Sequence, residues 1–356
     1  MVQTLESLRA EVDAANLKIL DALNERLRLV EAIRRIKEKS SSRLYSPERE
    51  AEMLDQLMLA NRGPISADEL RSLFKEIFKL SLDHMKADTR MQLHVHRAEG
   101  DEDRVYEVRG HRLGEGPQLI AGPCSVESVE QCELVAARLA ALGVGFLRGG
   151  AFKPRTSPYS FQGLGEAGLK MLREVADRHD MAVVTEILDT RHFDLVERYT
   201  DVFQVGTRNM YNYELLKLLG QADRPVLLKR GFMATLEEFL LAAEYVAKEG
   251  NQRIVLCERG IRTHERWTRN TLDLSAIPLL RMATPFPVVV DISHGTGRTD
   301  IMVPMARAAL AAGAQGLMVE VHPSPALALS DNAQQLDLEQ VDAFYAAVFN
   351  GMSGSS

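Results

Sequence analysis

The first 90 residues carry a helical period of apolar positions. Between residues 5 and 33, apolar side chains recur at steps of three and four, which predicts one long amphipathic helix. Ser46 followed by Pro47 is typical of an N-cap and a first turn, and predicts a second helix. Ser66 with Glu69 three residues later predicts a third. Three such helices make a thin core, so the single apolar stripe of the first helix indicates pairing with another protomer.

The pattern changes after this helical region. Residues 104–113 alternate between apolar and polar side chains, which predicts a short strand pair or a linker. From about residue 117, short apolar runs rich in β-branched residues alternate with helical patterns such as Glu127–Leu142 and Leu236–Lys248. The runs occupy residues 118–123, 146–151, 182–187, 202–206, 225–230, 253–258, 287–293 and 316–321.

Eight strand–helix units in roughly 240 residues predict a (β/α)8 barrel, a TIM barrel of the α/β class. A doubly wound open sheet is the alternative. Eight units of nearly equal length favour closure, and no Gly-rich dinucleotide motif follows the first run. We therefore expect an all-α three-helix domain at residues 1–90 that dimerises, a linker with a strand pair at 91–112, and a barrel at 113–350.

Composition narrows the class of protein. The chain has 356 residues, a net charge of −7 and no long basic run, so we expect no nucleic-acid partner. Three cysteines give no disulfide framework, which favours a reducing, cytoplasmic location. No apolar stretch is long enough to span a membrane, so we expect no membrane partner.

Four metal-ligand residue types stand at or after the ends of predicted strands. Cys124, His294 and Glu320 end the first, seventh and eighth runs, and Asp331 follows the eighth. Closure of a barrel makes these three strands neighbours, so three of the side chains fall on one arc, and Asp331 can reach the same spot. A thiolate, an imidazole and two carboxylates can hold a divalent cation for Lewis-acid catalysis, although these ligands alone do not select one metal.

Cationic residues gather at the other strand ends. In a barrel of this kind the active site lies at the carboxyl ends of the strands. An acidic protein that concentrates cations there is expected to bind phosphate or carboxylate groups. These cations are Arg148, Lys153, Arg155, Arg208, Lys229 and Arg259.

Several segments of the barrel carry a resemblance to a known family. They include Gly122-Pro-Cys-Ser-Val-Glu-Ser, Leu147-Arg-Gly-Gly-Ala-Phe-Lys-Pro-Arg-Thr-Ser-Pro, Leu228-Lys-Arg-Gly, Cys257-Glu-Arg-Gly-Ile-Arg-Thr and Asp291-Ile-Ser-His. With these segments the chain resembles the 3-deoxy-D-arabino-heptulosonate 7-phosphate (DAHP) synthases. That family condenses phosphoenolpyruvate with erythrose 4-phosphate, the first step of the shikimate pathway. The sister enzyme that uses arabinose 5-phosphate is the competing interpretation, and Lys153-Pro-Arg-Thr favours the four-carbon sugar.

The resemblance implies a role for each site residue. It implies a divalent metal, with Mn2+ as the first candidate, and proton donation by Lys153. One departure from the family pattern is Thr207, where the family has Ala. The backbone N–H of Thr207 is still available to bind a phosphate. By this likeness the metal ligands are Cys124, His294, Glu320 and Asp331, and the catalytic residues are Cys124, His294, Arg148 and Lys153. The residues that bind phosphoenolpyruvate are Arg148, Lys153, Arg208, Lys229 and Arg259. Those that bind erythrose 4-phosphate are Arg155 and Thr156.

The helical region resembles the all-helical chorismate mutases, which rearrange chorismate to prephenate. Arg26 and Lys37 are eleven residues apart, so they point within about 20° of each other and lie ~16 Å apart along a helix. Arg9 is ~25 Å from Arg26 and about 100° round, so it has to come from the partner chain of an intertwined dimer. By this likeness the chorismate or prephenate site comprises Arg9, Arg26, Lys37, Arg49 and Glu50.

Two interpretations of the helical region stay open. Met85 stands where the mutases place a hydrogen-bond donor, and Ser46 stands where they have Asp. The region is therefore an active mutase, or a regulatory module through which chorismate or prephenate inhibits the barrel, or both. A charged solvent face also explains many helical arginines. We expect a homodimer or a homotetramer.

Overall fold

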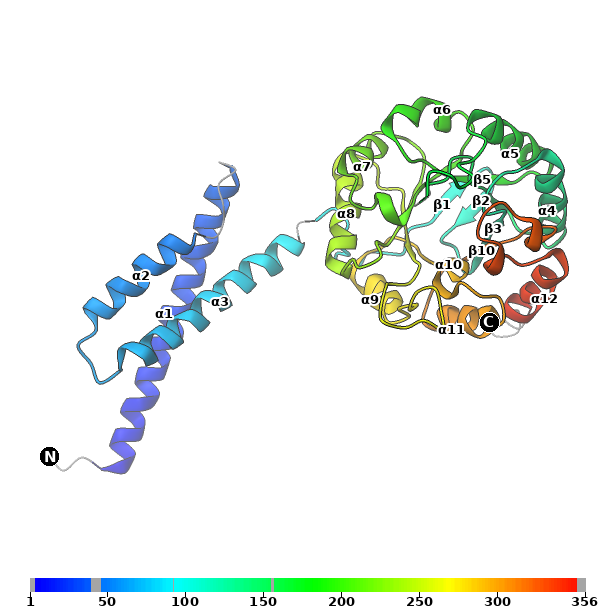
Figure 1. Cartoon of the computed structure of the whole chain (residues 1–356). Helices are drawn as coiled ribbons and strands as arrows, with labels where there is room; N and C mark the ends of the chain where they lie inside the picture. Colours follow the sequence, from blue (N-terminus) through cyan, green and yellow to red (C-terminus); the bar gives the residue numbers. More distant parts are fainter. Residues whose placement is uncertain (1–3, 40–45, 92, 155–156, 351–356) are drawn as a thin grey trace. The chain divides into compact units, whose positions relative to one another are not determined.

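The computed structural model describes residues 4–39, 46–91, 93–154 and 157–350. The chain divides into two compact units, residues 1–93 and 94–356. Figure 1 shows helices alone in the first unit and a ring of helices around a barrel in the second. No helix in the described part of the chain is long and apolar enough to cross a membrane.

The first unit consists of α1 (Leu5–Lys39), α2 (Pro47–Ala60) and α3 (Ala67–Met91). The predicted caps are confirmed. The Ser46 side chain accepts a hydrogen bond from the Arg49 N–H, and Ser66 exchanges hydrogen bonds with Glu69 in a capping box. The sequence also predicts that Ser40-Ser-Ser ends the first helix, and these residues lie outside the described part of the chain.

The core of this unit is thin, as the pattern predicts. Leu54, Leu70 and Phe78 are its buried apolar side chains among the described residues. Apolar side chains along α1, among them Val12 and Ile19, remain exposed. One copy of the unit therefore leaves a row of apolar surface in contact with water.

The barrel of the second unit is closed. Its parallel strands follow the order β10-β3-β4-β5-β6-β7-β8-β9, so the predicted fold is confirmed and the open-sheet alternative is wrong. The strands are β3 (Gln118–Gly122), β4 (Phe146–Arg148), β5 (Ala182–Glu186), β6 (Val202–Val205), β7 (Val226–Lys229), β8 (Ile254–Glu258), β9 (Val288–Asp291) and β10 (Gly316–Glu320).

Helices surround the strands on the outside of the barrel (Figure 1). Their inner faces are apolar, as in α8, where Phe239, Ala243 and Val246 are buried. The helices are α4 (Val129–Ala141), α5 (Glu166–Arg178), α6 (Phe193–Glu197), α7 (Tyr213–Gly220), α8 (Leu236–Lys248), α9 (Ala276–Ala283), α10 (Ile292–Thr296), α11 (Met302–Ala311) and α12 (Leu338–Phe349), with short 3-10 turns at 190–192, 207–209, 325–327 and 332–334.

A small antiparallel hairpin precedes the barrel. It consists of β1 (Tyr106–Val108) and β2 (His111–Leu113). Tyr106, Val108 and Leu113 share one buried cluster with Phe146 and other residues near the starts of the barrel strands. The hairpin therefore closes the amino-terminal end of the barrel with apolar side chains and leaves the carboxyl end open for the site.

The seam between β3 and β4 depends on a glycine. Gly122 has φ +151°, and a Cβ at this position would lie 2.0 Å from the backbone oxygen of Arg148. Gly122 lies two residues before Cys124, and an alanine in its place would have to move the backbone of β4. The close approach of the strands thus requires a residue without a side chain.

We expect Gly122→Ala to lower the free energy of unfolding by ~3 kcal/mol or more, because the clash falls on rigid backbone. Gly116→Ala is the matched control: φ is +72°, but its Cβ would meet nothing within 4 Å, so the cost is ~1–2 kcal/mol. Thermal unfolding followed by circular dichroism measures both. Equal melting temperatures for the two variants would show that the seam tolerates a side chain.

Candidate active site

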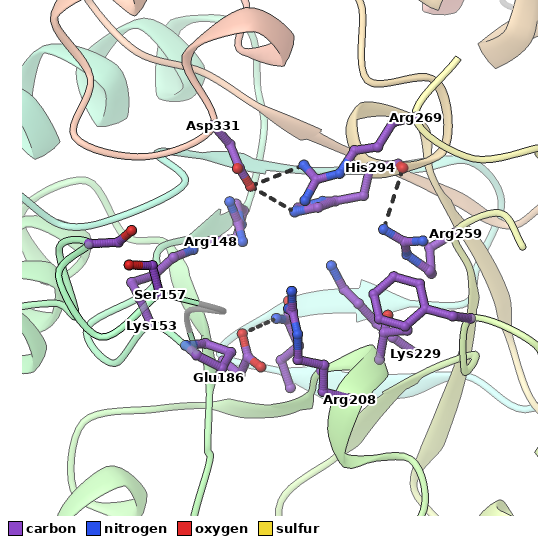
Figure 2. A pocket seen from close by; sticks show the side chains of 16 residues that line it. Arg148, Lys153, Ser157, Glu186, Arg208, Lys229, Arg259, Arg269, His294 and Asp331 are labelled. Atoms are coloured by element: carbon purple, nitrogen blue, oxygen red, sulfur yellow. Dashed lines mark hydrogen bonds and ion pairs between the residues drawn. The ribbon is translucent and has the colours of Figure 1, made fainter. Parts of the chain in front are cut away.

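A cavity of about 300 Å³ opens at the carboxyl ends of the barrel strands (Figure 2). Asp331 and His294 line one side of the cavity, and Arg208, Lys229 and Glu186 line the other (Figure 2). Among the predicted residues, Arg148, Lys153, Arg208, Lys229, Arg259, His294 and Asp331 line it. Arg155 and Thr156 lie outside the described residues.

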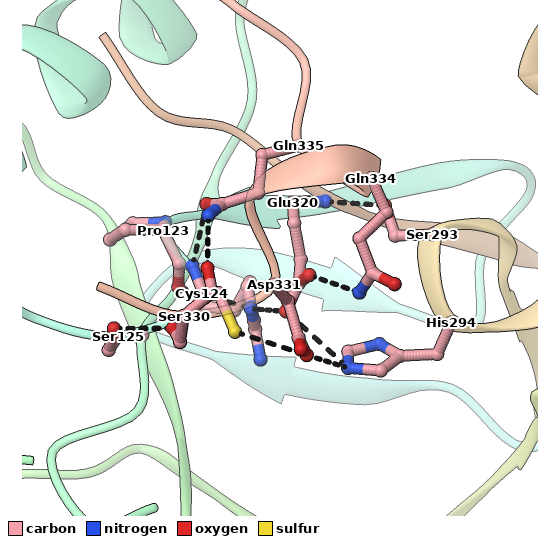
Figure 3. Close-up of polar contacts among 12 residues, drawn as sticks. Pro123, Cys124, Ser125, Ser293, His294, Glu320, Ser330, Asp331, Gln334 and Gln335 are labelled. Atoms are coloured by element: carbon pink, nitrogen blue, oxygen red, sulfur yellow. Dashed lines mark hydrogen bonds and ion pairs between the residues drawn. The ribbon is translucent and has the colours of Figure 1, made fainter. Parts of the chain in front are cut away.

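The four predicted metal ligands meet at one edge of the cavity (Figure 3). One ligand atom from each of Cys124, Glu320 and Asp331 lies within 4.8 Å of the other two. The Nε2 atom of His294 is 3.5 Å from Glu320 Oε1 and 3.6 Å from Asp331 Oδ2. The closed barrel produces this arrangement, because β10 pairs with β3 on one side and with β9 on the other.

Cations compensate the charge of this cluster. Arg148 donates to Glu320 Oε1 over 2.7 Å with both side chains buried, and Lys153 Nζ lies 3.1 Å from Cys124 Sγ. Burial raises the pKa of Glu320, but the charges of His294, Arg148 and Lys153 outweigh burial and lower it to about 2. Glu320 is therefore a carboxylate at neutral pH, ready to act as a ligand.

The thiol of Cys124 is in a different state. Burial, together with the charge of Glu320, raises its pKa to about 12. A thiol becomes a strong metal ligand only when it loses its proton. One sulfur and two carboxylates nevertheless lie within 4.8 Å of one another, and the imidazole of His294 lies beside the two carboxylates. This donor set suits a divalent transition metal and fits the cofactor that the sequence predicts.

Two glutamines hold the ligand residues in place (Figure 3). Gln334 donates to Glu320 Oε2 over 2.6 Å. Gln335 accepts a hydrogen bond from the Cys124 N–H at 3.1 Å and donates to the Ser330 carbonyl at 2.8 Å. The segment carrying Asp331 is thereby fastened to β3 and β10, and Asp331 itself adopts a left-handed backbone with φ +46°.

Asp291 connects the two sides of the cavity. Its Oδ2 atom is 2.8 Å from His294 Nδ1 and 2.5 Å from Lys229 Nζ, and all three groups are buried or nearly so. Burial opposes the charged form, but His294 and Lys229 outweigh it and hold the pKa of Asp291 well below its usual range. A carboxylate in this position orients the imidazole so that Nε2 faces the ligand cluster.

Arg208 and Arg259 form the opposite wall of the cavity. Within the described part of the chain, no carboxylate lies within ion-pair distance of either guanidinium, whereas Arg148, Lys229 and Arg269 each have one. Burial lowers the pKa of Arg259, whose side chain donates only to the Gly260 and His294 carbonyls at 3.3 and 3.4 Å. Two uncompensated guanidiniums beside one cavity are suited to binding an anion from solution.

Several cavity residues were not predicted, among them Glu186, Gln204, Gly206 and Arg269. Glu186 ends β5 and Gln204 lies in β6, so the strand-end rule that found the other residues also applies to Glu186. A Cβ at Gly206 would lie 1.9 Å from Glu186 Oε1, so the carboxylate of Glu186 would have to move to admit one. Arg269 lies in the long loop after β8 and reaches Asp331 at 3.2 Å. Its position depends on loop geometry, for which the sequence carries no periodic signal.

The helical unit has a pocket of its own, of about 340 Å³. Arg26, Lys37, Arg49 and Glu50 line it together, whereas Arg9 does not. The Arg26 guanidinium lies over the Phe78 ring at 5.1 Å and donates to the hydroxyl of buried Ser81. Apolar side chains of α1, including Leu29 and Ile33, complete the wall, so the pocket combines several charges with an apolar floor.

Two family models match the chain. Residues 95–351 match the DAHP synthetase I family, and residues 8–86 match chorismate mutase type II. A phospho-2-dehydro-3-deoxyheptonate aldolase from Thermotoga maritima is 56% identical over 239 residues, covering 67% of this chain and 71% of that protein. A 2-dehydro-3-deoxyphosphooctonate aldolase from Koribacter versatilis is 30% identical over 257 residues, covering 66% of this chain and 91% of that protein.

Solved structures give the same result for the barrel. The crystal structure of a DAHP synthase from Thermotoga maritima is similar with a TM-score of 0.69 and 53% identity, covering 70% of this chain and 74% of that chain. A truncated form of the Thermotoga maritima synthase gives a TM-score of 0.66 and 49% identity, covering 70% of this chain and 92% of that one.

We expect Glu320→Gln to weaken divalent-cation binding at least about tenfold, because it removes a charged ligand atom from the cluster. Glu258→Gln is the matched control: Glu258 is also fully buried, ends β8 and pairs with an arginine, Arg230, at 2.8 Å. Calorimetric titration of chelator-treated protein with Mn2+ measures both affinities. Equal weakening by the two substitutions would mean that the cation binds elsewhere.

Proposed function

The chain belongs to the DAHP synthetase I family, and on this premise we propose how its barrel condenses phosphoenolpyruvate with erythrose 4-phosphate. Its first unit is a chorismate mutase type II domain, so one chain carries a transferase and an isomerase. One observation carries the proposal for the barrel: a cluster of metal-ligand side chains lies across one cavity from two guanidiniums that have no carboxylate partner among the described residues.

Phosphoenolpyruvate binds along the cationic wall. Arg208 and Arg259 hold its phosphate, because they are the arginines of the cavity that no described carboxylate compensates. Lys229 supports the same end, and the backbone N–H of buried Thr207 is available to a phosphate oxygen. Arg148 and Lys153 contact the carboxylate end, so the enol carbon points towards the ligand cluster.

Enzymes of this family typically depend on a metal ion. The proposed ligands are Cys124, His294, Glu320 and Asp331, and Mn2+ is the proposed ion. A divalent cation held by these residues supplies the Lewis acidity that polarises the aldehyde oxygen of erythrose 4-phosphate.

The remaining steps fall to side chains of the barrel. The enol carbon of phosphoenolpyruvate attacks the aldehyde carbon, and Lys153, within hydrogen-bond reach of the ligand cluster, donates a proton to the new alkoxide. Water adds to the cationic carbon left on the former phosphoenolpyruvate. Glu186, the cavity carboxylate that is not a proposed ligand, accepts the proton of that water. Phosphate then leaves by C–O cleavage.

The sugar phosphate has a separate place in the proposal. Arg155 and Thr156, which lie outside the described residues, bind the phosphate of erythrose 4-phosphate. Lys153 and Ser157, the nearby described residues on either side, line the cavity, which supports this proposal. The loop sequence Lys153-Pro-Arg-Thr supports the four-carbon sugar over arabinose 5-phosphate.

The pocket of the helical unit is proposed to bind chorismate and prephenate. Arg26, Lys37 and Arg49 supply cations and Glu50 a carboxylate around an apolar floor. This combination suits a dicarboxylate such as chorismate, whose carbocyclic ring carries an ether-linked side chain. Met85, whose side chain lies outside the described residues, leaves the catalytic strength of the pocket open. The pocket is also proposed to bind the effector that inhibits the barrel.

Arg9 requires a second copy of the chain. It lies on the same helix as Arg26 but does not line the pocket of its own protomer. The exposed apolar row of α1 supports pairing of two copies, because association removes that row from water. We propose a homodimer built on this helix, or a homotetramer that contains it, and a cytoplasmic location consistent with three free cysteines.

We expect a chelator to abolish condensation and Mn2+ to restore it, because the aldehyde is not polarised without a cation. Chorismate rearrangement needs only the cations of the helical pocket, so its rate in the same chelated sample stays unchanged. Paired assays on one preparation measure both reactions. Full condensation activity in metal-free protein would contradict the proposal.

We expect Arg26→Ala to slow chorismate rearrangement about 100-fold and to remove inhibition of the barrel by prephenate, with condensation in the absence of prephenate unchanged. Arg35→Ala is the control, because Arg35 lies on the same helix but is exposed and pairs with Glu31. Persistence of inhibition after loss of rearrangement would separate the effector site from this pocket.

A further inference from the structure

Phe232 occupies an unusual position between β7 and α8. Its ring lines the cavity, and three guanidiniums lie over it: Arg208 at 5.6 Å, Arg259 at 4.9 Å and Arg262 at 4.4 Å from the ring centroid. Guanidiniums at these distances are attracted by the negative face of an aromatic ring. Arg208 and Arg259 line the cavity, whereas Arg262 is exposed and does not.

The loop that carries Phe232 is held by a buried network. Arg230 donates to Glu258 at 2.8 Å, to Asp273 at 2.9 Å and to the carbonyl of Ala234 at 2.9 Å. The carbonyl of Phe232 accepts a hydrogen bond from the Arg262 N–H at 2.8 Å. These contacts fix both ends of the short segment 230–234, so the ring has a defined place at the wall of the cavity.

Arg208 and Arg259 make few other contacts that fix their side chains. In the described part of the chain, neither has a carboxylate partner, and Arg259 makes only long hydrogen bonds to backbone carbonyls. A free arginine side chain has several rotatable bonds, and ordering it costs conformational entropy. The Phe232 ring compensates part of that entropic cost. A carboxylate would neutralise the charge of the guanidinium, whereas the ring does not.

We propose that Phe232 is a positioning residue, which holds the Arg208 and Arg259 guanidiniums by cation–π contact so that both meet the phosphate of phosphoenolpyruvate. The inference rests on the proposed function, in which these arginines bind that phosphate. Because an aromatic ring leaves the N–H donors free, the arginines stay cationic and open to a dianion in the empty site.

The test uses the full-length protein with saturating Mn2+. Phe232→Leu removes the aromatic face and keeps an apolar side chain, and we expect the KM for phosphoenolpyruvate to rise on the order of tenfold. The phosphate of phosphoenolpyruvate is bound in the ground state as well as in the transition state. We therefore expect the substitution to change kcat by no more than about twofold. Inorganic phosphate, as a competitor of phosphoenolpyruvate, should lose affinity in parallel, while the KM for erythrose 4-phosphate stays unchanged.

Two further variants distinguish an aromatic role from a packing role. Phe232→Tyr keeps the ring and should restore the KM to within about twofold of the native value, whereas Phe232→Met, another flexible apolar side chain, should behave like Phe232→Leu. Phe286→Leu is the matched control, because Phe286 also lies under an arginine, Arg104, at 5.0 Å but precedes β9 at the other end of the barrel. It should leave the KM for phosphoenolpyruvate unchanged.

The outcomes separate this inference from the proposed function. If Arg208→Ala and Arg259→Ala raise the KM for phosphoenolpyruvate but Phe232→Leu leaves it within twofold, the positioning role is wrong and the phosphate site stands. If the arginine variants also have no effect, the phosphate site itself is wrong. A Phe232→Tyr variant as impaired as Phe232→Leu would overturn the role of the ring.

Discussion

The parallel pairing of β10 with β3 is the contact on which the site depends. In this register Glu320 lies opposite Gly122, and the Val321 N–H donates to the Gly122 carbonyl at 2.9 Å. The pairing joins the last strand to the first, so Cys124 and Glu320 become neighbours although almost the whole barrel separates them in sequence. An open sheet would leave these strands as two distant edges and the proposed ligands without a common point.

The buried charges of the cavity fall into two groups. Arg148–Glu320 and Lys229–Asp291 are internal pairs, in which each partner offsets the cost of burying the other. Arg208 and Arg259 have no such partner among the described residues and rest against an aromatic ring instead. The first group fixes the architecture of the cavity, and the second leaves its charge available to an anionic substrate.

The sequence predicted the barrel well because strand and helix periods are local signals that repeat. It also placed Cys124, His294 and Glu320 together, since closure follows from the count of units. Other features depend on distances that no period encodes. Arg269 reaches Asp331 from a long loop, and the ring of Phe232 meets three arginines only once the loops after β6, β7 and β8 are built. Glu186 could have been found by applying the strand-end rule to β5.

The left-handed backbone at Asp331 restricts how the ligand set can change over evolutionary time. With φ +46°, the position favours glycine, asparagine and aspartate over other residues. Glycine has no side chain to offer a ligand atom, and the side chain of asparagine has no charge. Glutamate, the other acidic residue, adopts this backbone less readily. No single substitution at this position therefore replaces the carboxylate of Asp331 with another carboxylate at low cost, so the proposed ligand set can change more readily at Cys124, His294 or Glu320.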